Sequence, residues 1–461
     1  MTSELKSLCD EITANSSSTF CILPWIHLAT RPNGDMRLCC TSNASGAETN
    51  EIEIGLVKHF HGGPANFSRE SPLEAWNNDY MKSVRLQMLS NQIPKSCTKC
   101  FKEESSGVVS KRVWETKYWI EEGIDINELV TSTNQDGSIS NKFRYLDLRL
   151  GNTCNLKCVM CSPHDSSRWL QDHSKLMSVT SSSVVRSQIE FDDISFNNRW
   201  YEQPSFWSDI YDQIPNLKQV YFAGGEPLMI KEHKLFLEEI IRRGYAKDIV
   251  VRYSSNGVFL TDEIIDLWSY FKQVKFAISI DAYGDRNHYI RFPTKWAEVE
   301  RALHMLDNTP DNVVVSIATA IQVLNVMHLP DFVKWKISQN YKKINLSVMP
   351  GEFVMGGGLI NMHFLYIPTF LSAKILPLEY KQELRKRFEE FKLWLQKNYT
   401  TDDVFWNVSS YGWKRWDSGI DFIECEDLSH LLPDFSEYIK NLDRIRGTDF
   451  SSTFPELKGL V

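Results

Sequence analysis

Short apolar runs alternate with amphipathic stretches through the middle of the chain. Each run is brief, mainly apolar and bounded by turn residues, which predicts strands at 145–150, 218–222, 249–254, 274–280, 313–320 and 343–349. The stretches between them carry apolar residues at helical spacing, as at Ile264 and Trp268 after a Thr261 N-cap. Strands that alternate with helices predict an α/β fold with a parallel sheet, and six such strands favour a partial (β/α)6, TIM-like barrel.

The segments on either side of this barrel follow other patterns. The predicted division is a polar tail, a cysteine-bearing domain, the barrel and a helical C-terminal extension: 1–18, 19–140, 141–350 and 351–461. Within the barrel, residues 162–213 form a long insertion between the first two strands. In the extension, a helix at 378–398 is expected to bury Leu384, Phe388, Phe391 and Leu395 on one face. Cys425 is expected to be a buried thiol there.

The composition is that of an ordinary globular protein. The 461 residues are 42% hydrophobic and 24% charged, which allows two or three domains. The net charge of -8 argues against a general nucleic-acid-binding surface, which needs clustered basic residues. No secretory signal is evident in the polar N-terminus, and the apolar stretch 362–378 is too interrupted to span a membrane. We therefore expect a cytoplasmic protein, in which ten cysteines indicate metal ligation rather than disulfides.

Three cysteines stand close together directly after the first predicted barrel strand. Cys154, Cys158 and Cys161 have the spacing C-x3-C-x2-C. Three thiolates can hold three irons of a 4Fe-4S cluster and leave the fourth iron without a protein ligand. The alternative is a zinc site that borrows its fourth ligand from elsewhere in the chain.

The carboxyl ends of the following strands carry glycine-rich or polar segments, at the end of a barrel where active sites form. These segments contain Gly224, Gly225 and Glu226, then Ser255 and Asn256, then Ser279 and Asp281, followed by Arg291. In this order after the cysteine triplet, they resemble the motifs of the radical S-adenosylmethionine (radical SAM) superfamily. This resemblance implies that the triplet binds a 4Fe-4S cluster. With the N-terminal cysteines described below, it covers residues from about 18 to about 350.

The same resemblance assigns parts of S-adenosylmethionine to particular residues. Gly224, Gly225 and Glu226 would bind its amino group, and Ser255 and Asn256 would bind its ribose. Further residues are assigned more loosely: Met160 beside the adenine, Ser279 and Asp281 in the fourth strand-end motif, Arg291 or its neighbour Arg286 at the carboxylate, and Gln322 and Asn325 as adenine contacts or helix caps. No residue is assigned as a general base, so the catalytic residues stay unknown.

A second cysteine set precedes the barrel. Cys21, Cys39, Cys97 and Cys100 fit C-x12-G-x4-C followed by C-x2-C, which resembles the twitch domain, the half-size form of the SPASM auxiliary-cluster domain. The resemblance implies a second 4Fe-4S cluster within 19–140, although most such domains follow the barrel. Cys40 competes with Cys39 for one position. The alternative is a structural zinc site that uses these thiolates, with His27 as a further candidate ligand.

The resemblance implies a radical SAM oxidoreductase. Such an enzyme cleaves S-adenosylmethionine reductively to a 5'-deoxyadenosyl radical, abstracts a substrate hydrogen and passes an electron to the auxiliary cluster. A peptide is the favoured substrate, and a small carbohydrate-like alcohol is the alternative. An electron donor such as flavodoxin or ferredoxin is the expected partner. From a different class, a zinc-stabilised, non-enzymatic binding protein stays open.

Overall fold

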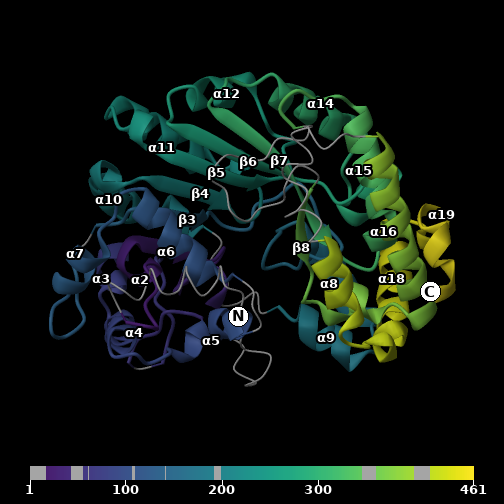
Figure 1. Ribbon diagram of the computed structural model, residues 1–461, viewed down its shortest axis with the longest axis horizontal. Helices are drawn as coiled ribbons and strands as arrows, with labels where there is room; N and C mark the ends of the chain where they lie inside the picture. Colours follow the sequence, from purple (N-terminus) through teal and green to yellow (C-terminus); the bar gives the residue numbers. More distant parts are fainter. Residues whose placement is uncertain are drawn as a thin grey trace. The chain divides into compact units, whose positions relative to one another are not determined.

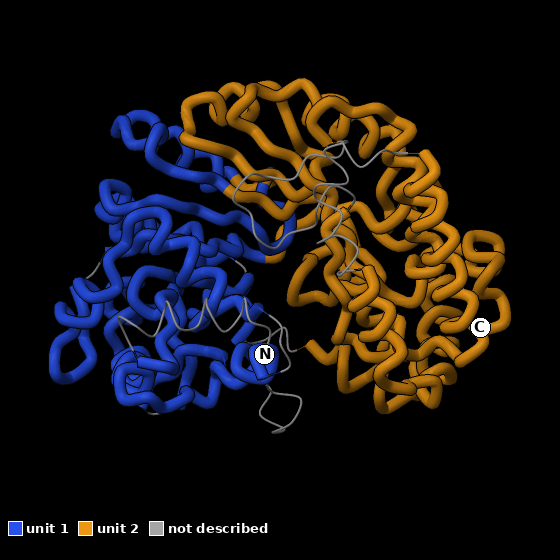
Figure 2. Tube along the Cα trace, viewed as in Figure 1, with its two compact units in different colours: residues 1–151, 196–227, 231–251 blue, residues 152–195, 228–230, 252–461 orange. Residues whose placement is uncertain are grey.

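A computed structural model describes residues 17–42, 55–60, 62–105, 109–140, 142–191, 199–344, 360–398 and 416–461. The chain divides into two compact units (Figure 2). Unit 1 contains residues 1–151, 196–227 and 231–251, and unit 2 contains residues 152–195, 228–230 and 252–461. The domain ranges predicted from the sequence stay predictions.

Unit 1 contains a sheet whose strands follow the order β2 (Met36–Arg37), β1 (His27–Thr30), β3 (Tyr145–Arg149) and β4 (Gln219–Ala223). β1 runs antiparallel to β2 and parallel to β3, which runs parallel to β4. Alternate residues point to opposite faces of a sheet. One face is therefore apolar, with Leu28, Leu146, Leu148, Val220 and Phe222 all fully buried. The other face carries polar side chains, including His27, Asp147 and Gln219.

The helices of unit 1 come from segments before, between and after these strands in the sequence (Figure 1). They are α2 (Leu23–Ile26), α3 (Pro72–Trp76), α4 (Asp79–Leu89), α5 (Thr98–Ser105), α6 (Lys111–Glu121), α7 (Ile126–Thr131), α10 (Pro204–Gln213) and α11 (Lys231–Arg242). The fully buried Arg85 of α4 connects several of them, because its guanidinium donates to the carbonyls of Pro24, Trp76 and Gly137. Satisfied in this way, a buried cation stabilises the packing of the N-terminal helices.

Unit 2 contains the remaining strands of the predicted barrel. β5 (Val250–Ser255) has its first two residues in unit 1 and the rest in unit 2, where β6 (Gln273–Ser279), β7 (Val313–Ile321) and β8 (Asn361–Phe364) follow in order. The pairs β6–β7 and β7–β8 are parallel. Of the predicted sixth strand, Lys343 and Ile344 are not in a strand, and residues 345–349 lie outside the described residues. The strand beside β7 is instead β8, which lies further along the chain.

The helices of unit 2 cover the insertion, the strand connections and the C-terminal extension. They are α8 (Trp169–Val179), α9 (Ser183–Ile189), α12 (Asp262–Trp268), α13 (Asp285–Ile290), α14 (Trp296–Asp307), α15 (Leu329–Ser338), α16 (Leu378–Asn398), α18 (Leu432–Arg446) and α19 (Phe450–Thr453). Thr261 caps α12 as predicted, since its hydroxyl accepts from the Ile264 amide. α16 buries the four predicted residues. Within the described part of the chain, no helix combines the length and apolar composition of a membrane span.

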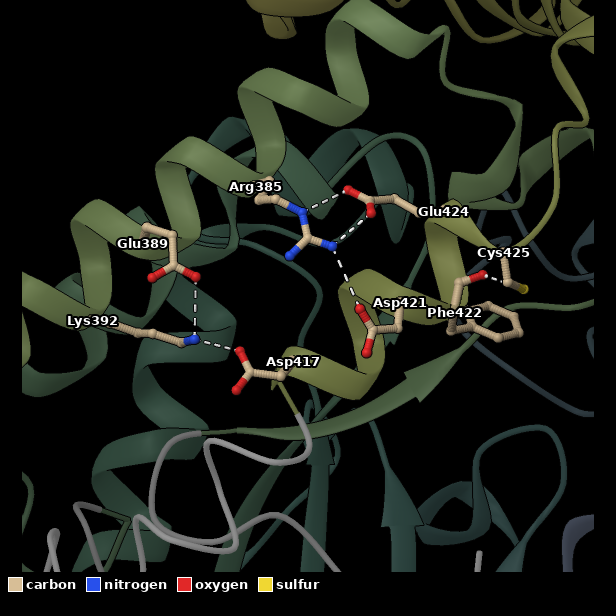
Figure 3. Close-up of polar contacts among 8 residues, drawn as sticks. All are labelled: Arg385, Glu389, Lys392, Asp417, Asp421, Phe422, Glu424 and Cys425. Atoms are coloured by element: carbon tan, nitrogen blue, oxygen red, sulfur yellow. Dashed lines mark hydrogen bonds and ion pairs between the residues drawn. The ribbon is translucent and has the colours of Figure 1, made fainter. Parts of the chain in front are cut away.

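The extension is joined on its surface by ion pairs between α16 and residues 416–424 (Figure 3). Arg385 forms a bidentate pair with Glu424 at 3.0 and 2.6 Å, and Lys392 binds Asp417. The expectation that Cys425 is buried is wrong: the residue is exposed, and its thiol donates to the Phe422 carbonyl at 3.2 Å. Ile420 and Ile423 form the buried side of this helical segment, and Cys425 lies just past its end.

Candidate functional site

The cysteine triplet lies in unit 2, on a loop anchored through its backbone. Cys158 is buried, and Cys154 and Cys161 are half-buried. The amides of Lys157 and Val159 donate to the carbonyls of Phe292 and Ile290 at 2.7 and 2.8 Å. The loop is therefore fixed against the segment that follows α13, close to Arg291.

The electrostatics of the triplet favour thiolate at one of its members. The pKa of the Cys158 thiol is lowered, first by a hydrogen bond from Cys161 and further by the positive charges of Arg291 and Arg446. The pKa of Cys161 is raised by that same hydrogen bond and by burial. A thiolate is the form of cysteine that binds iron, so Cys158 is prepared as a ligand.

Arg291 and Asp281 form a buried ion pair. Arg291 Nε lies 2.9 Å and Nη2 3.1 Å from the two Asp281 carboxylate oxygens, and Asp281 also accepts from the Ala320 amide at 2.7 Å. Burial raises the pKa of Asp281 in spite of this pair. Although burial alone would lower it, the pKa of Arg291 is raised because Asp281 lies beside it. Asp281 thus orients a permanently charged guanidinium next to the cysteine loop.

Two of the other candidates for carboxylate and adenine contacts, Arg286 and Asn325, are used elsewhere. Arg286 pairs with Glu456 in the C-terminal segment, through Nη2 at 2.9 Å and through Nη1. Asn325 closes the turn after β7, since its side chain donates to the carbonyls of Asp281 and Ala320 and accepts from the Gln322 amide. The Gln322 side chain is fully buried, and within the described residues neither of its polar atoms has a hydrogen-bond partner.

Asn256 is brought to the cysteine loop. Its side-chain amide donates to Asn155 Oδ1 at 2.8 Å, and its own Oδ1 accepts from the Val258 amide at 3.0 Å. The neighbouring Ser255 is buried, and its hydroxyl accepts from the Gly257 amide at 2.9 Å. Ser279 ends β6 and Met160 lies between the second and third cysteines, both half-buried. Unit 2 therefore gathers the triplet with Asn256, Asp281 and Arg291.

The glycine pair after β4 belongs to unit 1 and has a steric reason to be there. Gly224 has φ +117°, and a Cβ at this position would come within 3.1 Å of the Gly151 carbonyl oxygen and 3.2 Å of Arg149 Cα. The Gly225 amide donates to the same carbonyl at 3.2 Å. The ends of β3 and β4 can approach one another this closely only with glycine at 224. Glu226, the next residue, is buried.

The four thiols of the second set line one cavity in unit 1. Cys21 precedes α2, Cys39 follows β2, Cys97 ends a short 3-10 helix (Lys95–Cys97) and Cys100 lies in α5. Three cationic side chains complete the wall: Lys99, Lys111 and Arg112. Four dispersed segments thus contribute cysteines to the lining of one cavity.

The pKa values of three thiols in this cavity, those of Cys21, Cys97 and Cys100, are raised. Burial raises the pKa of Cys21, and the neighbouring Cys97, Cys100 and Cys39 raise it further. Burial, followed by the charge of Cys39, raises the pKa of Cys100 to about 11. Such thiols resist ionisation until cations compensate their charge, which iron ions do. The donor set therefore fits an iron-sulfur cluster.

The competing ligands lie outside this cavity. Cys40 is not part of its lining, and its half-buried thiol has Lys111 and Asp147 as charged neighbours. His27 lies on β1 against the Tyr145 ring, with 4.4 Å between ring centroids, and burial lowers its pKa to about 3. Within the ranges that the structure describes, no three His, Cys, Asp or Glu side chains converge on a point where one metal ion would fit.

Several charged residues around these sites were not identified from the sequence. Lys111 in the cavity wall forms an ion pair with Glu115 at 2.6 Å. Burial opposes its charge, yet the neighbouring Cys40 and Glu115 raise the pKa of Lys111, so the ammonium persists. The only local signal is the pair Lys111-Arg112 directly after the Ser110 N-cap of α6, and such a pair is common on exposed helices.

Comparison with known families agrees with this geometry. The model of the radical SAM superfamily matches residues 148–335, and the model of the SPASM iron-sulfur cluster-binding domain matches residues 21–101. The chain therefore contains a radical SAM domain and a SPASM-type iron-sulfur domain. Its two matched domains imply 4Fe-4S clusters and S-adenosylmethionine as cofactors. The SPASM-type domain precedes the radical SAM domain in the chain, as the cysteine spacing predicted.

Comparison with solved structures gives matches of low identity and low TM-score. A structure described as native anSMEcpe with bound AdoMet is 16% identical, covers 54% of this chain and 59% of its own, and has a TM-score of 0.33. The same protein with bound AdoMet and Cp18Cys peptide is 16% identical, covers 52% of this chain and 57% of its own, and has a TM-score of 0.31. TYW1 with a lysine-pyruvate adduct bound is 15% identical, covers 40% of this chain and 58% of its own, and has a TM-score of 0.24. This chain thus spans less than two thirds of each of them. No curated protein matches it.

Proposed function

We propose that this radical SAM enzyme is an oxidoreductase in which the cluster of the SPASM-type domain accepts an electron from the substrate radical, which becomes the oxidised product. The observation that carries the proposal is the cavity of unit 1, which is lined by Cys21, Cys39, Cys97 and Cys100. Four thiolates can ligate all four irons of a cubane. With no iron left open for a substrate, electron transfer is the use that such a cluster has.

Cofactor binding is assigned to the residues that carry the motifs. Cys154, Cys158 and Cys161 would hold a cluster with one open iron, and Arg291, oriented by Asp281, would face the carboxylate of S-adenosylmethionine. Gly224, Gly225, Glu226, Ser255 and Asn256, with Met160 and Ser279, complete the proposed binding set. When both are bound and the cluster is reduced, the 4Fe-4S cluster and S-adenosylmethionine supply a 5'-deoxyadenosyl radical that abstracts a substrate hydrogen.

The residues of the chain have two tasks in this scheme. In unit 2, the backbone anchors at Lys157 and Val159 and the contact of Asn256 with Asn155 keep the cysteine loop in one conformation. In unit 1, the cations Lys111 and Arg112 offset the negative charge that a reduced cluster carries. A positive wall favours the reduced state, which is what an electron acceptor requires.

A peptide is the proposed substrate, because many relatives with SPASM or twitch domains modify peptides. A small carbohydrate-like alcohol is the second candidate. Where a gene for a short peptide lies beside this gene, that peptide is the direct probe. With such a peptide, anaerobic turnover should increase 5'-deoxyadenosine formation, and the peptide should lose two hydrogens. If only alcohols have this effect, the peptide assignment is wrong.

The electron-acceptor role is tested with Cys97→Ala. The variant should still form 5'-deoxyadenosine, since its triplet is intact, but should lose net oxidation of the substrate. Iron and sulfide analysis of the anaerobically purified wild type separates clusters from zinc. Zinc in place of iron, or full substrate oxidation by Cys97→Ala, would exclude the proposed role.

A further inference from the structure

The C-terminal extension contacts the backbone of the cluster loop directly. Tyr438 of α18 is buried, and its hydroxyl donates to the Val159 carbonyl at 2.8 Å. Val159 lies immediately after Cys158, and its amide is already held by the Ile290 carbonyl. The peptide groups on both sides of Val159 are therefore fixed, one of them by the extension.

The insertion after the cysteine loop provides a second anchor. Trp169, the first residue of α8, is buried, and its Nε1 donates to the Cys158 carbonyl at 2.9 Å. One turn further along α8, Asp172 accepts from Lys157 Nζ at 2.7 Å. Lys157 and Cys158 are thus held by α8, while Val159 is held by α18.

Arg446, the last residue of α18, lies where these anchors meet. Its side chain is 1% exposed, and its Nε donates to Asp172 Oδ2 at 2.8 Å. Its guanidinium carbon lies 4.5 Å from the centroid of the Trp169 ring and 5.2 Å from that of Phe292. Phe292 in turn accepts the Lys157 amide through its carbonyl. Arg446 therefore packs against the residues that bind the loop from both sides.

The charge of this cluster of side chains is not balanced. Lys157 and Arg446 share one carboxylate, that of Asp172, at 3% exposure. Within the described residues, Nη1 and Nη2 of Arg446 are buried and have no hydrogen-bond partner. A buried cation in excess costs free energy unless a negative charge lies within range. A thiolate-ligated cluster on the adjoining loop is such a negative charge.

We propose that Arg446 is a positioning residue that also sets the reduction potential of the cluster held by Cys154, Cys158 and Cys161. The inference rests on the proposed ligation of that cluster by these cysteines. A positive charge behind the loop stabilises the reduced cluster more than the oxidised one and so raises the potential. The C-terminal extension is in this way a part of the cofactor site, and not only a covering element.

The test is an anaerobic redox titration of the full-length enzyme, followed by electron paramagnetic resonance. The relevant signal is the one that changes on addition of S-adenosylmethionine, which distinguishes this cluster from the auxiliary one. Arg446→Met should lower the midpoint potential, and Arg446→Lys should stay close to the wild type because it keeps the charge. Asp172→Asn should shift the potential in the opposite direction, which keeps the test decisive if Arg446→Met fails to fold.

Two further variants separate charge from structure. Tyr438→Phe removes the hydrogen bond to Val159 without a change of charge and should leave the potential near that of the wild type. Arg444→Met, at an exposed position of α18, is the matched control and should have no effect. An unchanged potential in Arg446→Met, or an equal fall in Arg446→Met and Arg446→Lys, would overturn the inference. Absence of the cluster from the wild type would instead overturn the proposed function on which the inference rests.

Discussion

A buried ion pair between Glu104 and Arg112 supports the cavity of the four thiols. Arg112 donates from Nε and Nη2 to the Glu104 carboxylate at 2.9 and 2.5 Å, and its Nη1 donates to the Phe20 carbonyl at 2.8 Å. The Ser110 hydroxyl donates to the same carboxylate at 2.5 Å. These bonds join α5, which carries Cys100, to the start of α6 and to the residue before Cys21.

The substitution Glu104→Gln tests how much this pair contributes. Its two side chains are 9% and 4% exposed, so little water is available to replace a lost partner. Removal of one member of a buried pair typically costs about 3–5 kcal/mol, because the other charge is left uncompensated. For a unit of this size, that corresponds to roughly 6–20 °C in melting temperature.

The measurement is thermal unfolding of the iron-free protein, followed by iron analysis after reconstitution. Glu103→Gln is the matched control, because the neighbouring Glu103 pairs with Lys99 at 3.6 Å and both side chains are about one third exposed. Exposed pairs contribute only about 0–1 kcal/mol. Glu104→Gln should melt far lower than Glu103→Gln and hold less iron in the auxiliary site. Equal melting temperatures for the two variants would refute the reasoning.

Further predictions concern single residues in the two units. Burial lowers the pKa of His233 from 6.5 to about 3, so protonation opposes folding and stability is lost as the pH falls from about 6.5 towards 3. His233→Gln should lessen this acid-side loss, by on the order of 4 kcal/mol at most, and identical urea titrations across that range would contradict it. Gly224→Ala should lower the free energy of unfolding by about 1–3 kcal/mol and weaken S-adenosylmethionine binding. Gly244→Ala, which has open space around its Cβ, should bind S-adenosylmethionine normally. Equal affinities of the two variants would argue against the steric account. Lys111→Met should lower the reduction potential of the auxiliary cluster in a redox titration. An unchanged potential would contradict the proposed role of Lys111 in offsetting the charge of the reduced cluster.

The sequence predicted the regular elements better than the irregular ones. The helix α16 and the strands β3 to β7 follow clear apolar periodicity and lie within one or two residues of their predicted ends, and α12 begins directly after its predicted N-cap. β1 and β8 were missed because each is only four residues long and contains a histidine and another polar residue. Cys425 was misjudged, since cysteine is usually buried and nothing local marks its position past a helix end.

Some residues of the candidate sites were predicted from the sequence, and others became evident only in the structure. Motif spacing identified the cysteines, and the structure brings Cys21, Cys39, Cys97 and Cys100 to one cavity. The ion pair of Arg291 with Asp281 was not foreseen, because ten positions and α13 separate the two residues. Arg446 lies far along the chain from the triplet, so only tertiary packing places it near the loop.

In the proposed function, the open-iron cluster held by Cys154, Cys158 and Cys161 cleaves S-adenosylmethionine. The most direct measurement is 5'-deoxyadenosine formation by anaerobically reconstituted enzyme with dithionite, compared with Cys158→Ala and with Cys425→Ala as an exposed control. The account predicts product from the wild type and Cys425→Ala, and none from Cys158→Ala, whose iron content should fall by about four atoms per chain. Equal product from Cys158→Ala, or no product from an iron-replete wild type, would contradict it.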